Sequence, residues 1–221
     1  MNNRRRIIGI VLIMLSLIIL CSVIFTSLYK YNGRRQEVLD FARQLDATDR
    51  TGKENVVPLI DRSASSVSEN VSDDTAPEEF EGEAFISEVE SGDCIGILTI
   101  DKINLTETVK EGSNDAILKN ALGHYEGTAA VGQEGNCCIL GHRNYVFGQF
   151  FNRLNELEEG DIVQIDTLYG TYFYEVTETY VVSPEQMEVL DYIEGNNLTL
   201  ITCTPLFVGS HRLIVRCKLI K

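Results

Sequence analysis

Three residue types that together support acyl transfer lie at the ends of predicted strands. Cys203 closes the apolar segment 197–203 just before Thr204-Pro205, and a strand should end there because proline has no N–H for the ladder. A hairpin between 197–203 and 211–220 would set Arg212 beside Cys203 across the sheet. His142 closes a further apolar segment. A thiol nucleophile, an imidazole that carries protons and a permanent cation near the thiol predict catalysis through a thioester.

Each residue taken alone also has a simpler interpretation. Cysteine is among the most buried residue types and usually packs as a small hydrophobe, which is the commoner role for a residue such as Cys203. An arginine at a strand start, such as Arg212, is most often a solvated surface residue. The hypothesis therefore depends on whether the fold brings the three side chains together.

The segments that must position these residues have the composition of β-strands. They are rich in β-branched and aromatic residues and are separated by Gly, Asn and Asp. The predicted strands are 95–100, 137–142, 161–167, 170–182, 197–203 and 211–220. Two short helical stretches are predicted at 113–120, with Ser113 as the N-cap, and at 147–157. Six to eight short strands in this length predict an all-β fold, a closed or nearly closed barrel with short helices.

The motifs around the three residues, taken together, resemble the sortases of Gram-positive bacteria. The matching segments are GHR at 141–143, TLITCTP at 199–205 and SHRLIVR at 210–216, in that order. Two flanking segments also resemble the family: GILTIDKINLTETVKEG (96–112) and ALGHYEGTAAVGQEGNCCILGHR (121–143). The resemblance covers about 95–221, and the Thr-Leu-x-Thr-Cys segment followed by Arg at this spacing is specific.

The resemblance implies a cysteine transpeptidase on an eight-stranded β-barrel. It implies that Cys203 is the nucleophile, that His142 is the general acid and base, and that Arg212 holds the substrate and the oxyanion. Thr202 and Thr204 are the predicted substrate-binding residues, although strand alternation should point the Thr202 side chain away from Cys203. The implied reaction cleaves a Leu-Pro-x-Thr-Gly-like sorting signal after Thr and passes the acyl group to a cell-wall amine.

Among the sortase classes, the sequence resembles class D most and class A next. An Asp-Pro-aromatic lid motif, typical of pilin-polymerising sortases, does not precede the barrel, because the upstream prolines are Pro58 and Pro77. The stretch 183–196 is too short for the helical insertion of class B. Two alternative functions remain: a surface cysteine peptidase without transfer, and a non-catalytic barrel that binds peptide at the cell surface.

The N-terminal part predicts a membrane anchor. Residues 7–25 carry no charge and as a helix would span about 28 Å, enough for a bilayer core. We expect a cytoplasmic tail at 1–6, an uncleaved transmembrane anchor at 7–25, a juxtamembrane helix and flexible acidic linker at 26–90, and the barrel at 91–221. The short tail and the acidic remainder favour a single-pass cell-membrane protein with its catalytic domain outside. The predicted partners are therefore the membrane, surface proteins with a C-terminal sorting signal and a cell-wall amine acceptor.

Composition and the remaining polar residues narrow the other possibilities. The 33 acids outnumber the 19 bases, for a formal charge of −14, which argues against nucleic acid as a partner. No cysteine pair has CxxC spacing, so neither a zinc site nor a thioredoxin-like motif is supported, and no cofactor is expected. Glu156, Glu158, Glu159 and Asp161 are acids that could contribute to a calcium site, although such a charge run is usually a solvated face. His124 and His211 are expected to be structural.

Overall fold

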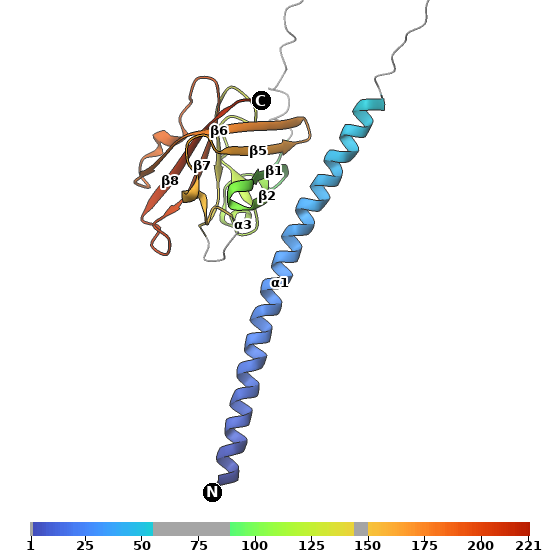
Figure 1. The fold of residues 1–221 in the computed structure, drawn as a ribbon, viewed down its shortest axis with the longest axis vertical. Coiled ribbons are helices and arrows are strands. Elements are labelled where there is room, and N and C mark those ends of the chain that lie inside the picture. Colours follow the sequence, from blue (N-terminus) through green and yellow to red (C-terminus); the bar gives the residue numbers. More distant parts are fainter. Residues whose placement is uncertain (1, 55–88, 144–149) are drawn as a thin grey trace, which may run out of the picture.

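A long helix and a closed β-barrel make up the described parts of the chain (Figure 1). The computed structural model describes residues 2–54, 89–143 and 150–221. Helix α1 runs over Asn2–Glu54, and the barrel follows from Cys94 onward. The eight-stranded barrel predicted from the sequence is thus confirmed.

The barrel closes in the order β1-β2-β3-β4-β7-β8-β6-β5. Its strands are β1 (Cys94–Ile100), β2 (Leu105–Glu111), β3 (Leu122–His124), β4 (Gly135–Leu140), β5 (Ile162–Thr167), β6 (Gly170–Val182), β7 (Asn196–Thr204) and β8 (His211–Leu219). Most neighbours are antiparallel, but β2 pairs parallel with β3, and β4 pairs parallel with β7. Closure leaves no free sheet edge, so each of these strands has hydrogen-bonded neighbours on both sides.

Alternation along the strands builds the core. On β8 the inward side chains of Leu213, Val215 and Cys217 are buried in the barrel interior. Ile214 points the other way and joins a smaller apolar cluster on the outer face. Both faces are therefore covered in the middle of β8, which explains why Leu213, Ile214 and Val215 are buried in succession.

Short helices occupy the connections. They are the α-helix α3 (Asp115–Leu118) and the 3-10 helices at Asp101–Ile103, Leu154–Glu156 and Met187–Leu190. The predicted cap of the first helix was wrong, because the Asn114 side chain rather than Ser113 accepts hydrogen bonds from Ala116 and Ile117. The helix predicted at 147–157 was also wrong in its described part, where only Leu154–Glu156 form one 3-10 turn.

Helix α1 contains the predicted apolar segment and continues well beyond it. It includes one stretch within Leu12–Ala47 that is long and apolar enough to cross a membrane. The large apolar side chains between Leu12 and Phe25 are exposed in the protein alone, as expected for a lipid-facing helix. The helix ends at Glu54, within the segment 26–90 that was expected to hold a juxtamembrane helix and a linker, and residues 55–88 of that segment lie outside the described residues.

A buried ion pair ties β3 to β2 inside the barrel wall. His124 is 4% exposed, and its two ring nitrogens contact Glu111 Oε2 at 2.8 Å and the Ala129 carbonyl at 3.0 Å. Burial alone would lower the pKa of His124, but the Cys137 and Glu111 side chains outweigh burial and raise it to about 10. The structural role predicted for His124 therefore has a physical basis, an imidazolium held between two acceptors.

Replacing His124 should remove a stability contribution that depends on pH. Because its folded pKa lies above the unfolded value of 6.5, this contribution is complete below pH 6.5 and is lost as the pH rises toward 10. We expect His124→Gln to lower the free energy of unfolding by about 2 kcal/mol at pH 6. At pH 9 the difference in unfolding free energy between the variant and the original chain should be smaller. Denaturant titrations followed by tyrosine fluorescence test this, and a gap that is constant between the two pH values would contradict it.

Candidate active site

One open pocket lies at the end of the barrel where β7 turns into β8. It is lined by His142, Arg143 and Cys203 together with residues of the turn 205–209. Its volume is about 180 Å³, below the range of about 300–1,000 Å³ typical of pockets that enclose a ligand. The pocket is therefore too small to enclose a drug-sized ligand.

Strand β7 brings His142 close to Cys203. It runs parallel to β4, with Leu140 paired to Ile201, and the Gly141 N–H donates to the Ile201 carbonyl at 3.1 Å. The Thr202 hydroxyl donates to the Gly141 carbonyl at 2.7 Å. Two hydrogen bonds to the residue before His142 thus fix its backbone beside the end of β7.

The same strand pairs Cys203 with Arg212. These two residues are directly opposite each other in the antiparallel β7–β8 ladder, as the sequence predicted. The Arg212 guanidinium donates through Nη1 to the Gly209 and His211 carbonyls, each at 3.1 Å. Gly209 in turn lies against Cys203, because a Cβ added to this glycine would stand 3.6 Å from the Cys203 Cβ. The Arg212 guanidinium is therefore held beside the turn that packs against Cys203.

A short turn forms the apolar wall of the pocket. The Val208 and Gly209 N–H groups both donate to the Pro205 carbonyl, at 3.2 and 2.9 Å. Phe207 and Val208 are 73% and 71% exposed at the tip of this turn. These two side chains therefore form an exposed apolar patch beside the Cys203 thiol, as is common at interaction sites.

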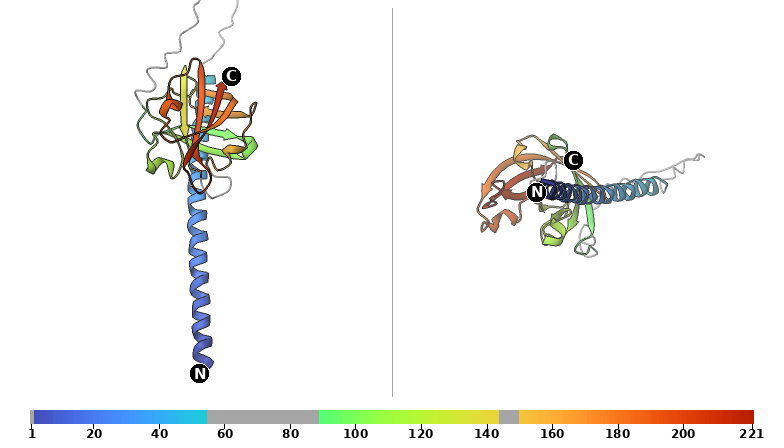
Figure 2. Two further views of the ribbon diagram at one scale, coloured as in Figure 1. Left: turned by 90° about the vertical axis from the view of Figure 1, so that its left-hand side faces the viewer. Right: turned by 90° about the horizontal axis from the view of Figure 1, so that it is seen from below.

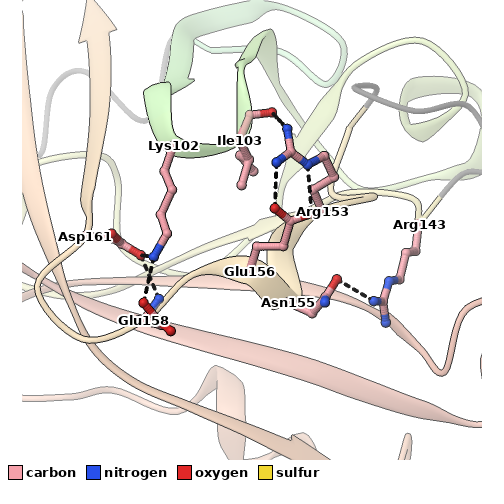
Figure 3. Close-up of polar contacts among 8 residues, drawn as sticks. All are labelled: Lys102, Ile103, Arg143, Arg153, Asn155, Glu156, Glu158 and Asp161. Atoms are coloured by element: carbon pink, nitrogen blue, oxygen red, sulfur yellow. Dashed lines mark hydrogen bonds and ion pairs between the residues drawn. The ribbon is translucent and has the colours of Figure 1, made fainter.

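Arg143 is a residue of this pocket that the sequence analysis did not assign to the site. Its guanidinium donates to Thr204 Oγ1 and to Asn155 Oδ1, both at 2.7 Å, and the second contact is drawn in Figure 3. Burial lowers the pKa of Arg143 from its usual value. The signal was present in the sequence, since Arg143 directly follows His142, but the partners come from two other segments.

The two threonines predicted to bind substrate lie differently from each other. Thr202 is 2% exposed and its hydroxyl is bound to Gly141, so its side chain points away from the pocket. Thr204 is half-buried at the end of β7 and accepts from Arg143. These contacts favour an orienting role for Thr202 and leave Thr204 at the pocket rim.

The other cysteines and His211 do not join the site. Cys137 and Cys138 point to opposite faces of β4, one into the barrel core and the other into the outer cluster. Cys94 is half-buried, Cys217 is buried, and all the cysteines that the structure describes are free thiols. His211 is exposed and contacts the Ser210 hydroxyl at 2.9 Å, and it does not line the pocket.

Three of the four loop acids considered for calcium, Glu156, Glu158 and Asp161, are paired with basic residues (Figure 3). Lys102 Nζ lies 2.9 Å from Glu158 Oε2 and 2.8 Å from Asp161 Oδ2. Arg153 holds Glu156 with two hydrogen bonds at 2.8 and 2.6 Å. Across residues 2–54, 89–143 and 150–221, no group of three or more His, Cys, Asp or Glu side chains is placed to hold a metal ion.

Comparison with known proteins identifies the fold and the motifs. The family model described as a sortase domain matches residues 98–220. Sortase D of Bacillus subtilis is 33% identical over 123 residues, which cover 55% of this chain and 60% of that protein. Sortase SrtE1 of Streptomyces coelicolor is 29% identical over 174 residues, covering 72% and 48%. The matches therefore span about half to three fifths of these curated relatives.

A solved structure agrees with the sequence matches. The Clostridium perfringens sortase D5 transpeptidase superposes with a TM-score of 0.57 and is 36% identical. The match covers 63% of this chain and 86% of that one. A class D sortase thus occurs among both the sequence relatives and the structural neighbours, as the predicted resemblance to class D requires.

The exposure of the thiols predicts which one reacts first. Cys203 lines the open pocket, whereas Cys137, Cys138 and Cys217 are buried, and burial raises the pKa of Cys94 to about 11. A polar thiol reagent at pH 7 should therefore label Cys203 before the other barrel thiols of the full chain. Peptide mapping by mass spectrometry measures this order. Labelling of Cys203 no faster than that of Cys137 would remove the thiol from consideration as a nucleophile.

Removal of Arg143 should impair the site without unfolding the barrel. Arg143→Ala leaves the Thr204 hydroxyl and the Asn155 amide without their charged partner, and the end of β7 is no longer held. We expect kcat/KM for peptide cleavage to fall about tenfold or more. Arg153→Ala is the matched control, because that arginine binds Glu156 and the Ile103 carbonyl instead. Equal kinetics for the two variants would contradict a role of Arg143 in the site.

Proposed function

The chain belongs to the sortase family, and from this we propose that it is a membrane-anchored cysteine transpeptidase. It cleaves a Leu-Pro-x-Thr-Gly-like sorting signal after Thr and transfers the acyl group to a cell-wall amine. The observation that supports the proposal is the pairing of β7 with both β4 and β8: Cys203 and His142 line one pocket, and Arg212 lies opposite Cys203 in the β7–β8 ladder.

The proposed first half-reaction makes a thioester. The Cys203 thiolate attacks the carbonyl carbon of the substrate threonine, and the electron pair of the C=O bond moves to oxygen. The Arg212 guanidinium, with its fixed fork of N–H donors, stabilises that oxyanion. His142 protonates the departing glycine nitrogen as the C–N bond breaks, which leaves the acyl group on sulfur.

The proposed second half-reaction transfers the acyl group. An amine enters the open pocket and attacks the thioester carbonyl, while His142 takes the proton that the amine loses. The C–S bond breaks, and Cys203 leaves as a thiolate ready for another cycle. Water in place of the amine would give the peptidase considered above, and the two outcomes differ only in the mass of the product.

The position of the pocket supports a substrate at the membrane. In Figures 1 and 2 the β7–β8 turn lies at the end of the barrel that faces the N-terminal half of α1. That half carries the apolar stretch long enough to cross a bilayer. We therefore propose that residues 1–6 are cytoplasmic, that 7–25 anchor the protein in a single pass, and that the catalytic domain 91–221 lies outside the cell. The partners would be surface proteins with a C-terminal sorting signal and a cell-wall amine.

Product analysis tests the proposed reaction. The full chain in detergent micelles is incubated with a library of sorting-signal peptides and candidate amines, and the products are identified by mass. A peptide cut after Thr and joined to an amine is the expected product. Acids alone would establish a peptidase, and unchanged peptides with measurable binding would favour the non-catalytic barrel.

Substitution of the two proposed catalytic groups on β7 and β8 should separate their roles. Cys203→Ala should abolish cleavage while the thermal unfolding of the barrel stays the same, because the side chain is only half-buried. Arg212→Lys should lower kcat about 100-fold, since a lysine keeps the charge but loses the planar fork.

A neighbouring arginine on the same strand provides the control. Arg216 binds the Tyr180 hydroxyl at 2.7 Å, so Arg216→Lys should leave kcat within about threefold of the original chain. Residual turnover by Cys203→Ala would reassign the nucleophile. Unimpaired turnover by Arg212→Lys would remove the oxyanion role.

A further inference from the structure

The second half of α1 is in contact with the barrel. Arg34 Nη1 lies 3.6 Å from Glu107 Oε1 on β2, and Glu37 Oε1 lies 3.3 Å from Lys110 Nζ on the same strand. Phe41 is 4% exposed, in contrast to the exposed apolar side chains before it in the helix. Contacts of α1 with β1 and β2 show that this part of the helix forms a layer on the barrel wall.

The ion pair at this contact is largely shielded from water. The Arg34 and Glu107 side chains are 13% and 10% exposed. Burial raises the pKa of the Glu107 carboxyl, while the Arg34 cation and a hydrogen bond from the Phe150 N–H act in the opposite direction. A carboxylate at this depth that lost its cation would be left with an uncompensated desolvation cost.

The same carboxylate is linked to the segment that follows His142. Glu107 accepts the Phe150 N–H, and the Arg34 guanidinium lies 4.9 Å from the centre of the Phe150 ring. Phe150 is 2% exposed and has a left-handed backbone with φ 47°. The next N–H, that of Phe151, donates to the His142 carbonyl at 3.1 Å. An unbroken series of contacts therefore joins Arg34 of the helix to the backbone of His142.

We propose that α1 supplies Arg34 as a positioning residue, and that the Arg34–Glu107–Phe150 cluster holds the backbone of His142 in place for the reaction. This inference rests on the proposed function for its kinetic consequence. The helix then helps to position an active-site residue, in addition to serving as an anchor and spacer. Arg34 does not contact the pocket residues and acts through Phe150 and Phe151.

The test compares variants of the full chain in lipid nanodiscs. Arg34→Ala and Glu107→Gln should each lower kcat for peptide cleavage about tenfold, with KM within about twofold of the original value. The double variant should be no worse than either single one, because both remove the same contact. Arg43→Ala is the matched control: this helix residue pairs with Asp40 on α1 itself and is well exposed. Its kcat should not change.

Hydrogen exchange provides a readout that needs no catalysis. The Phe150 and Phe151 amides should exchange about tenfold faster in Arg34→Ala and Glu107→Gln than in the original chain, and not in Arg43→Ala. Unchanged exchange, or an unchanged kcat in an active enzyme, would overturn the proposal. If the original chain cleaves no peptide, the proposed function fails, and the exchange rates alone decide whether the helix holds the segment next to His142.

Discussion

The register of β7 against its two neighbours is the constraint on which the site depends. Parallel pairing with β4 sets Gly141 beside Ile201, and antiparallel pairing with β8 sets Arg212 opposite Cys203. A slip of one residue would turn every β7 side chain to the other face, so that Cys203 would enter the core and Leu200 would leave it. The buried faces of β7 therefore fix the geometry of the pocket through the hydrophobic effect.

Charges buried near the site depend on partners from distant parts of the chain. Glu107 is shielded by the helix that contains the apolar segment, and Arg143 is held by residues of two other segments. His124 of β3 is paired with Glu111 of β2 inside the barrel wall. Such groups fix positions closely, because leaving any one of them unpaired in a low-dielectric interior is costly. The surface acids with Lys102 are more exposed and contribute little to this rigidity.

The sequence predicted the features that alternate strongly and missed those that depend on remote partners. The strands 170–182, 197–203 and 211–220 were found because β-branched residues repeat along them. Strand β2 was not among the strands predicted from composition, because its LTETVKE sequence has polar residues on both faces, and Glu107 is buried only against Arg34, 73 residues earlier. The apolar residues Phe150, Phe151 and Leu154 suggested a helix, but they enter the barrel core from an irregular stretch and a single 3-10 turn. Motifs were enough to propose Cys203, His142 and Arg212 as site residues, whereas the bonds of Arg143 to Thr204 and Asn155 become visible only in the folded chain.

A covalent intermediate tests the central claim most directly. The full chain is mixed with a sorting-signal peptide in the absence of an acceptor amine. The reaction is quenched in acid within the first turnover, and the mass of the intact protein is measured by mass spectrometry. The account predicts a mass gain equal to the acyl group of the peptide that ends at its threonine. Digestion should locate this acyl group on Cys203, and hydroxylamine should remove it, as expected for a thioester. An adduct on another residue, or substrate turnover without any acyl-enzyme, would contradict it.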